Sequence, residues 1–321
     1  LVILLLALLG WAAQHAFSRD TADASLAQRL ALWQQTLGLI MQHPWAGVGW
    51  AQLNFVWTLT PFADRAPDVF DHAHSLPLHL AVELGIPVTV AAATLVIVAL
   101  WPARVQRAMS ANAGQARIGV AALLLLSIGT HSLFEYPLWF SYFLMPTAFV
   151  LATLARDLAA TPPAPAASTT NTAPAARLTS ARLIASMATL LLIATGWSVH
   201  EYSKASAIHF TGNDQGARAD AVAAARASPL YGQYGDYAAI MLAGDRAPLE
   251  WFARPIRNVL DERLLTAWAR ALQRAGEHER AAWVIARARE FPPDAAFAGL
   301  PQVTAPLNPA SAPRSAEDFR R

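Results

Sequence analysis

An uncharged apolar run fills residues 84–101 and reads LGIPVTVAAATLVIVALW. Its length suits a helix that crosses the hydrocarbon core of a bilayer. The whole chain has the same bias, because 55% of its 321 residues are hydrophobic and only 14% are charged, against roughly 25% in a soluble domain. The composition therefore predicts an all-α, polytopic membrane helix bundle.

Other apolar segments extend this pattern in both directions. Residues 84–155 are predicted to form three transmembrane helices, and residues 182–199 a further one. The apolar run that opens the chain, residues 1–13, is too short to cross a bilayer by itself. We interpret it as the last part of a transmembrane helix, and the chain as the C-terminal part of a longer protein.

Arginines set the predicted orientation of these helices. One short loop carries three arginines with no acidic residue among them, Arg104, Arg107 and Arg117. A Pro/Ala-rich linker, residues 156–181, also begins with an arginine. Loops rich in arginine and lysine stay in the cytoplasm, so both are assigned to that side. Residues 14–83, the turn at Glu135 and everything after residue 199 then lie on the opposite face.

The longest polar stretch between apolar segments covers residues 14–83. Polar loops of this length usually have a function, since a connector needs only a few residues. Within it, residues 26–42 are predicted to form an amphipathic helix that begins with a capping box at Ser25 and ends before Pro44.

This predicted helix has two distinguishable faces. Its apolar residues recur at helical spacing and are Leu26, Leu30, Trp33, Leu37 and Met41. Four glutamines lie mostly off this stripe and are Gln28, Gln34, Gln35 and Gln42. Such a helix lies flat at the membrane interface or packs on neighbouring spans, and the stripe alone does not choose between the two.

Residues 200–300 are charged, Ala-rich and helical in pattern, with no further apolar span. Four helices are predicted there, at residues 221–227, 234–242, 264–275 and 278–289. The last two have small residues at the offsets of a tetratricopeptide (TPR) repeat, and the others supply neighbours because one such unit cannot bury its own face. We predict a TPR-like helical domain, followed by a disordered tail at residues 301–321.

Candidate catalytic groups concentrate in the long loop. His72 and His74 lie in a polar segment, and an exposed histidine accepts a proton near neutral pH, as a general base must. The alternative is a pair of surface or packing histidines. A metal site would need more ligands, such as Asp71 or His79, but no HExxH or similar spacing is present.

Charged groups near the predicted membrane surface offer a second kind of chemistry. The guanidinium of Arg29 suits a bidentate grip on phosphate, although an arginine that only extends its charge into water is the alternative. Arg65 has the same two interpretations. Glu135 lies where two predicted spans meet a short turn, and it either needs a partner or caps a helix.

Several classes of function are excluded by what is absent from the sequence. A net charge of +2 with no Lys/Arg cluster along a helix face argues against nucleic-acid binding. Without cysteine there is no disulfide, thiolate nucleophile or Cys-bound metal. No Walker A loop, GxSxG elbow or kinase motif is present, so the energy for any reaction has to come from the substrate.

Several blocks together resemble the O-antigen ligase/polymerase superfamily. They are Arg29-x3-Trp33, HPWAGVGW at residues 43–50, DHAHSLPL at residues 71–78 and VELGIP at residues 82–87. HSLFEYPLW at residues 131–139 is similar to a block in the branch of PglL-type protein O-oligosaccharyltransferases. The resemblance covers most of residues 1–300.

The resemblance implies a bacterial inner-membrane enzyme whose catalytic loop, residues 14–83, and C-terminal domain are periplasmic. Such enzymes transfer a glycan from an undecaprenyl-diphosphate carrier without a metal or other cofactor. His74 matches the key loop histidine of the family, and Arg29 matches an arginine linked to the lipid diphosphate. The predicted substrate-binding residues are Arg65, His72, Ser75, Glu135 and Tyr136. The family commonly has Asn where Ser75 stands, although serine still donates and accepts a hydrogen bond.

The acceptor divides the implied functions. The TPR-like tail favours a hydroxyl on Ser or Thr of a periplasmic or pilin protein, which would make the chain a protein O-oligosaccharyltransferase. The alternatives are an O-antigen polymerase that extends glycan repeats and a ligase that acts on lipid A core. From another class, the chain would be a non-catalytic membrane scaffold. Expected partners are the lipid-linked oligosaccharide, the acceptor and membrane lipid, but not nucleic acid.

Overall fold

The computed structural model describes residues 19–99, 115–159, 174–258 and 260–291, together with 300, 303 and 307–309. Within these ranges the regular elements are helices and there is no strand, which confirms the all-α class. The partial span predicted at residues 1–13 lies outside the described residues, as does most of the tail predicted at residues 301–321.

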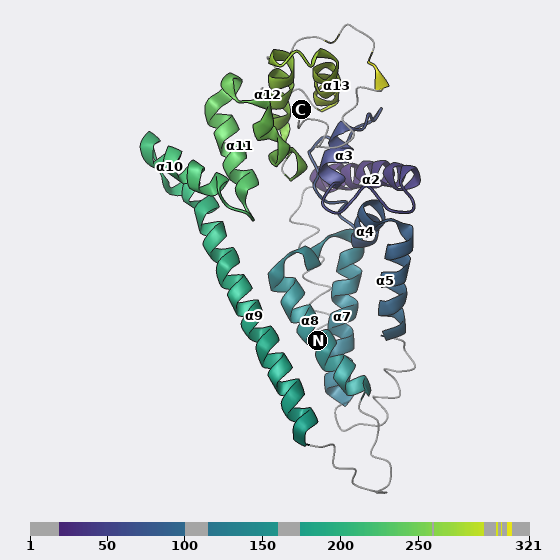
Figure 1. Cartoon of the computed structure of the whole chain (residues 1–321). Coiled ribbons are helices and arrows are strands. Elements are labelled where there is room, and N and C mark those ends of the chain that lie inside the picture. Colours follow the sequence, from purple (N-terminus) through teal and green to yellow (C-terminus); the bar gives the residue numbers. More distant parts are fainter. Residues whose placement is uncertain are drawn as a thin grey trace, which may run out of the picture.

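Apolar helices occupy one end of the molecule (Figure 1). They are α5 (Ile86–Ala99), α7 (Gln115–Phe134) and α8 (Ser141–Ala159), and the long α9 (Pro174–Ala207) runs from that end towards the C-terminal region. Among the described residues, one helix is long and apolar enough to cross a membrane, namely Ala116–Phe134 within α7, and Ile86–Val98 is a shorter apolar helix. The spans predicted within residues 84–155 and at residues 182–199 lie largely within helices, but apart from Ala116–Phe134 they stay predictions as membrane spans.

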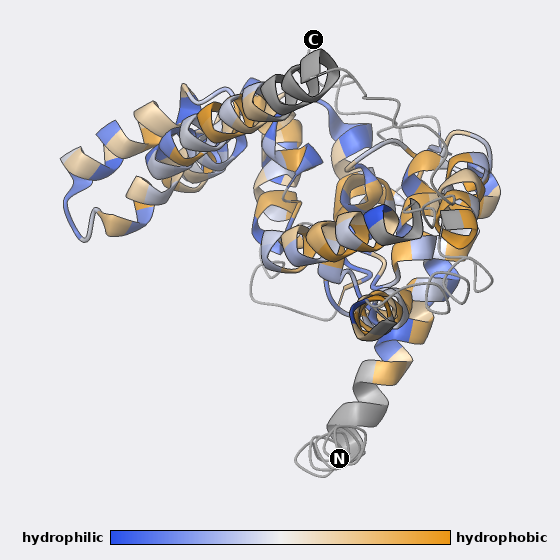
Figure 2. Cartoon of the chain, turned by 90° about the horizontal axis from the view of Figure 1, so that it is seen from below, coloured by the Kyte–Doolittle hydropathy of each residue, from blue (hydrophilic) through white to orange (hydrophobic). Residues whose placement is uncertain are grey.

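These helices expose large apolar side chains, as the hydropathy colouring of Figure 2 helps to follow. Examples are Leu95, Ile97, Leu123, Leu126, Met145, Phe149, Leu190, Leu192 and Ile193. Only a small core of Ile118, Ala121, Leu125 and Leu154 is buried between α7 and α8. Soluble monomers rarely expose contiguous apolar surface on this scale, so the surface of this end favours an apolar surrounding.

The linker predicted at residues 156–181 is helical at both ends. α8 continues to Ala159, and α9 is described from Pro174 onwards. α9 then passes the predicted end of the last span and stops at Ala207. The intervening residues 160–173 lie outside the described ranges.

The amphipathic helix is longer than predicted. α2 (Arg19–Gln42) begins seven residues before residue 26, which puts Ser25 inside the helix, so the predicted capping box is wrong. The physical reason is that residues 19–25 contain neither glycine nor proline to interrupt the helix. Its end at Gln42, before Pro44, is confirmed.

The predicted apolar stripe of α2 is not its packing face. The helix buries Leu32, Leu39 and Ile40 in a core shared with α3 (Leu53–Leu59). Four stripe residues, Leu26, Leu30, Leu37 and Met41, are exposed, and Trp33 is half-buried.

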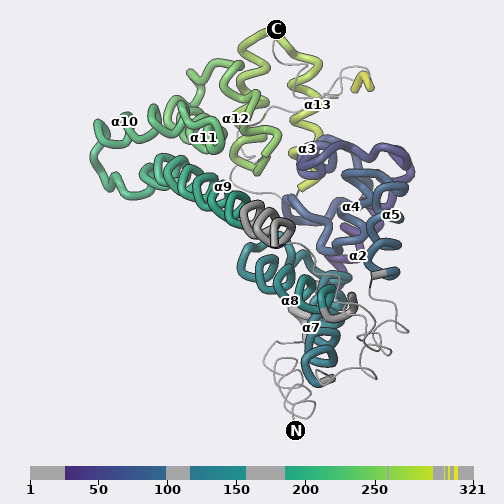
Figure 3. The backbone as a smooth tube through the Cα atoms, turned by 60° about the horizontal axis from the view of Figure 1, so that its bottom comes forward, coloured from purple at the N-terminus to yellow at the C-terminus, as the bar shows by residue number. Residues whose placement is uncertain are grey.

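Four helices follow one another beyond α9 and end against α3 (Figure 3). They are α10 (Gln215–Arg226), α11 (Gly232–Ala243), α12 (Glu262–Arg274) and α13 (His278–Ala288), which confirms the helices predicted from the sequence. The Trp283 indole N–H donates to the Leu59 carbonyl at 3.0 Å, and the Leu260 N–H donates to Asn54 Oδ1 at 3.0 Å. The long loop and the C-terminal helices therefore share one core.

Candidate functional site

Two glycine-containing blocks build the loop by packing backbone against backbone. The Val48 N–H donates to the Val82 carbonyl at 2.8 Å, and the Gly49 N–H donates to the Glu83 carbonyl at 3.1 Å. Gly47 has a φ of +67°, and a Cβ there would overlap the Glu83 carbonyl group, so this approach requires glycine. These contacts fix α4 (Leu76–Leu84) and thereby the histidine segment that precedes it.

The Glu83 side chain completes this junction. Its carboxylate accepts the N–H groups of Ala51 at 2.9 Å and Leu53 at 3.2 Å. Burial raises the pKa of Glu83, although the backbone hydrogen bonds act in the opposite direction. Because an unpaired buried carboxylate is costly, these N–H groups tie the start of α3 to the end of α4.

The backbone at His74 is in an unusual conformation, with a φ of +47°. Left-handed backbone is uncommon in residues other than glycine and costs on the order of 1–2 kcal/mol. The Trp33 indole N–H donates to the Ala73 carbonyl at 2.9 Å, so α2 helps to hold this segment in place. Among the described residues other than glycine, Ala51 shares this left-handed backbone, with a φ of +57°. Strained residues cluster at functional sites, and His74 is the one of the two whose side chain is able to accept a proton.

Glu135 joins the two residues predicted to be catalytic. Its Oε2 atom lies 2.9 Å from Nδ1 of His74, and its Oε1 atom pairs with the Arg29 guanidinium. Arg29 also donates to the Phe134 carbonyl at 3.4 Å. The three side chains come from α2, from the segment before α4 and from the turn after α7. Each is partly exposed, by 24% to 37%, so a substrate can reach the cluster.

The carboxylate beside His74 assigns the two nitrogens of the ring. In a neutral imidazole one nitrogen carries the proton and the other accepts one. With Nδ1 facing Glu135, the proton belongs on Nδ1 and Nε2 remains the acceptor. The arrangement of a carboxylate that orients a histidine base is a general solution for activating a hydroxyl.

Behind this cluster, aromatic rings enclose two further histidines of the loop, His72 and His79. The centroid of His72 lies 4.3 Å from that of Tyr136 and 5.0 Å from that of His79. Trp139 meets both histidines edge-on. His72 was predicted to bind substrate, but it is buried in this stack, which corresponds to the packing alternative.

Burial sets the charge state of this ring stack. His79 is only 2% exposed, and burial lowers its pKa to about 4, so the ring is neutral at ordinary pH. The pKa of the Tyr136 hydroxyl is raised, first by burial and then by Asp71 and Glu135. Asp71 Oδ1 lies 2.8 Å from His72 Nδ1, and the proximity of that ring lowers the pKa of Asp71.

Ser75 and Tyr136 lie next to the cluster in different ways. Ser75 is the N-cap residue immediately before α4, is buried, and makes no side-chain hydrogen bond to that helix. Tyr136 is half-buried and meets the His74 ring edge-on at a centroid distance of 5.0 Å. Sequence reasoning did not assign Trp33, His79 or Trp139 to the site, although both tryptophans lie in the blocks that carry the family resemblance.

Arg65 is not brought to the cluster. Its side chain is 0% exposed and pairs with Glu290 at 2.8 Å, and it also donates to the Trp57 carbonyl at 3.2 Å. The guanidinium lies over the rings of Phe62 and Phe291. Arg65 thus connects the loop to the C-terminal helices. Because these donors are used inside the protein, we do not propose Arg65 as a substrate ligand.

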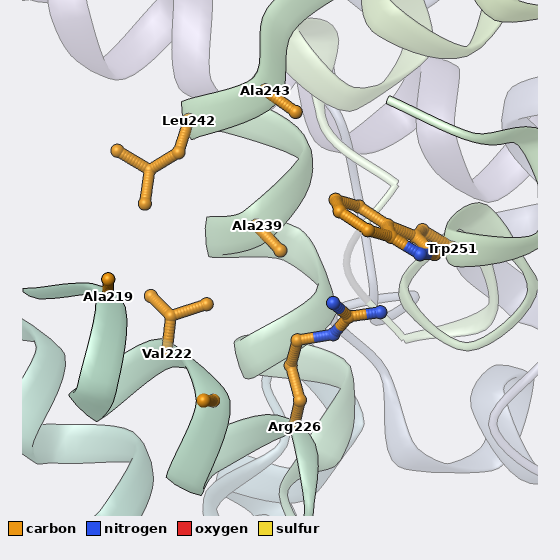
Figure 4. Close-up of a pocket in the computed structure, with 8 residues that line it drawn as sticks. Ala219, Val222, Arg226, Ala239, Leu242, Ala243 and Trp251 are labelled. Carbon is orange, nitrogen blue, oxygen red and sulfur yellow. The ribbon is translucent and has the colours of Figure 1, made fainter. Parts of the chain in front are cut away.

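A cavity of about 360 Å³ lies between α10 and α11, away from these residues (Figure 4). It is lined mostly by apolar side chains, including Val222, Ala239 and Leu242. At its edge the Arg226 guanidinium lies 4.1 Å from the ring centroid of Trp251. In the described part of the chain, no group of three or more His, Asp or Glu side chains is arranged to hold a metal ion, and metal independence stays a prediction.

Fold and site together define a helical protein with an apolar outer surface at one end and a charged cluster on an adjoining loop. Two family models match this chain, one described as "Virulence factor membrane-bound polymerase, C-terminal" over residues 119–304 and one described as "O-Antigen ligase" over residues 1–93. The first match covers more than half of the chain, which therefore belongs to this membrane-bound family of the O-antigen ligase superfamily.

A curated relative agrees with this assignment. The chain is 30% identical over 128 residues to a "General O-oligosaccharyltransferase" of Acinetobacter baylyi (strain ATCC 33305 / BD413 / ADP1), an alignment that covers 39% of this chain and 21% of the relative. The match thus spans about a fifth of the length of that protein. No solved structure matches the chain.

Proposed function

We propose that this chain carries the reaction centre of a membrane glycosyltransferase that moves a glycan from undecaprenyl diphosphate to an acceptor hydroxyl. The observation that carries the proposal is that Glu135 holds Arg29 and His74 on its two oxygens. These residues lie 106 and 61 positions away from Glu135 in the sequence. This reaction needs a base and a cation that binds phosphate. His74 and Arg29 supply these two groups, and both contact the partly exposed carboxylate of Glu135.

His74 acts on the acceptor. Its Nε2 atom takes the proton of the acceptor hydroxyl while that oxygen forms a bond to the anomeric carbon of the glycan. The Nδ1–H group keeps its hydrogen bond to the Glu135 carboxylate, which stabilises the imidazolium as its charge develops. General base catalysis of this kind contributes about 10²–10⁴-fold in rate.

Arg29 acts on the donor. As the new bond forms, the bond between the anomeric carbon and the phosphate oxygen breaks, and the electron pair leaves with the diphosphate. The planar guanidinium of Arg29 is able to bind two phosphate oxygens at once and to stabilise the negative charge that grows on the leaving group. In the absence of donor, Glu135 balances this positive charge. The energy comes from the donor bond that is broken.

The surroundings supply the remaining contacts. Tyr136 keeps its phenolic proton because its pKa is raised, so it donates a hydrogen bond to a sugar hydroxyl, and Ser75 lies one residue after the base. We place the cluster and the C-terminal domain on the periplasmic side of the inner membrane, the helices at residues 84–155 and 182–199 in the bilayer, and the linker in the cytoplasm. The arginine distribution supports this orientation.

The acceptor is proposed to be a Ser or Thr hydroxyl of a periplasmic or pilin protein. The similarity to an O-oligosaccharyltransferase supports this choice, and so does the row of helices α10–α13, which we interpret as a TPR-like surface for polypeptide. The family described as a membrane-bound polymerase favours a second candidate, extension of a glycan repeat, and the O-antigen ligase match favours transfer to lipid A core.

The test uses the complete membrane protein, purified with a lipid-linked glycan. Three acceptors are offered in parallel, a pilin-type protein, lipid A core and a carrier-linked glycan, and mass spectrometry identifies which one gains the glycan. The expected product is the glycosylated protein. Transfer to another acceptor would replace this choice by the corresponding alternative. If the wild-type protein transfers the glycan to none of the three acceptors, and so behaves like the His74→Ala variant, the scaffold is favoured. Deleting the C-terminal domain is a poor test, because it would expose the shared core.

A further inference from the structure

A polar groove runs along the side of α2 that is turned away from Arg29. Its α2 wall consists of Ala31, Gln34, Gln35, Gly38 and Gln42, and residues 60–64 form the opposite wall. Its volume of about 380 Å³ is in the range of small-molecule sites. Gly38 lies about 14 Å along the helix axis from Arg29 and about half a turn around it. The groove is therefore separate from the charged cluster.

Gly38 lies in the α2 wall of this groove at a cost to the helix. Glycine inside a helix is less favourable than alanine by about 1 kcal/mol. A Cβ at Gly38 would meet no atom within 4 Å, so packing among the described residues does not require glycine there. The missing side chain instead leaves open space at this wall, in which a ligand is able to approach the helix backbone.

The four glutamines of α2 fall into two groups. Gln28 pairs with Asp68, and Gln35 accepts the Trp57 indole N–H at 2.9 Å. By contrast, Gln34 and Gln42 are exposed, line the groove, and have no side-chain hydrogen bond to another described residue. Each free amide offers both a donor and an acceptor, a combination that matches neighbouring hydroxyls on a sugar ring.

The charge of the lining selects the class of ligand. Asp64 is the ionisable residue among the described residues that line the groove, and it is a carboxylate. Phosphate or diphosphate would be repelled here, in contrast to the cluster at Arg29. Pro61 and Phe62 add apolar surface, against which the C–H face of a sugar can pack. Amides, a carboxylate and apolar surface together fit a neutral, hydroxyl-rich ligand.

We propose that this groove binds a glycan segment remote from the sugar that reacts. The inference rests on the proposed function, since the diphosphate at Arg29 fixes the reacting sugar at the cluster. The segment belongs either to the donor glycan or to a glycan already on the acceptor. Because Gly38 lies about 14 Å further along α2 than Arg29 and on the opposite side of the helix, a single sugar at the cluster does not reach it and an oligosaccharide is required.

Direct binding tests the groove without catalysis. The free oligosaccharide released from the donor is titrated into the complete protein and followed by saturation-transfer difference NMR. Gly38→Leu places a bulky side chain in the groove and Gln34→Leu removes one amide, while Ala27→Leu, exposed on α2 outside the groove, is the matched control. We expect Gln34→Leu to weaken binding about tenfold, the order of one or two lost hydrogen bonds. Gly38→Leu should weaken binding at least as much because its side chain takes the place of the ligand, and the control should bind like wild type. No binding to wild type, or unchanged binding to Gly38→Leu, would overturn the proposal.

Transfer kinetics then distinguish the two sources of the glycan. If the groove holds the donor glycan, Gly38→Leu raises KM for a donor with the full oligosaccharide and leaves KM for a single-sugar donor unchanged. If it holds the acceptor glycan, KM rises only for a glycosylated acceptor. An equal loss with every pair of substrates would contradict both. A wild-type protein without transferase activity would remove the proposed function, whereas the NMR result addresses the groove alone.

Discussion

The α12–α13 pair buries Trp268, Leu264 and Leu272 completely, whereas the cluster of Arg29, His74 and Glu135 stays partly exposed. The helix pair begins with a regular N-cap, in which Asp261 accepts the Leu264 N–H at 2.8 Å. The loop instead holds His74 in left-handed backbone. One region thus satisfies its local preferences, and the other does not.

This difference shows which region stabilises the fold and which region is strained. Buried apolar side chains such as Trp268 lower the free energy of the folded state, and the core that contains them extends into α3. The strain at His74 is tolerated because Trp33 and the Gly47 junction hold the neighbouring backbone. Mutations in the helix pair are therefore expected to change stability, and mutations in the cluster to change activity.

The largest effect is expected from His74→Ala. Loss of the general base should reduce glycan transfer by about 10²–10⁴-fold. The fold should persist, because the left-handed backbone at this position is strained for histidine as well as for alanine. Transfer is measured with purified donor and acceptor, and the melting temperature in detergent shows whether the fold persists. His209→Ala, at an exposed position, is the control. Transfer at the wild-type rate would remove His74 from the mechanism.

Two tryptophans test the structural side of the comparison. Trp268 is 0% exposed, whereas Trp45 is 78% exposed. Trp268→Ala should destabilise the protein by about 3–5 kcal/mol, because it removes apolar contacts and leaves a cavity, and Trp45→Ala should cost far less in detergent. Chemical denaturation followed by circular dichroism provides the measurement. Equal losses in the two variants would mean that the buried core does not dominate stability.

Acid should weaken the loop through His79. Its pKa is about 4 in the folded state and 6.5 in the unfolded chain, so the unfolded chain takes up a proton first as the pH falls. The stability contributed by the neutral ring is fully present above pH 7 and is lost between pH 6.5 and 4, by about 3 kcal/mol at most. Melting temperatures measured across this range should fall less steeply in His79→Gln than in His209→Gln. Parallel slopes in the two variants would contradict the assignment.

The sequence allowed the helices of the C-terminal domain to be predicted because their Ala-rich composition and the spacing of their small residues are local signals. Arg29, His74 and Glu135 were also identified, but their meeting depends on contacts across 61 and 106 residues. The same limit explains Arg65, whose partner Glu290 lies 225 residues away. The burial of His72 was not predicted, because the ring of Tyr136 that covers it comes from the turn after α7.

The smallest predicted effect in the cluster belongs to Arg29→Lys, and it decides between the two interpretations of that residue. Lysine keeps the positive charge but lacks the planar pair of donors, so transfer should fall by about ten- to a hundredfold, mainly in kcat, if Arg29 binds the leaving diphosphate. Combined with Glu135→Gln, the loss should be less than the product of the single effects, because both variants disturb the same ion pair. An arginine that only extends into water predicts wild-type turnover in Arg29→Lys and independent effects in the double variant.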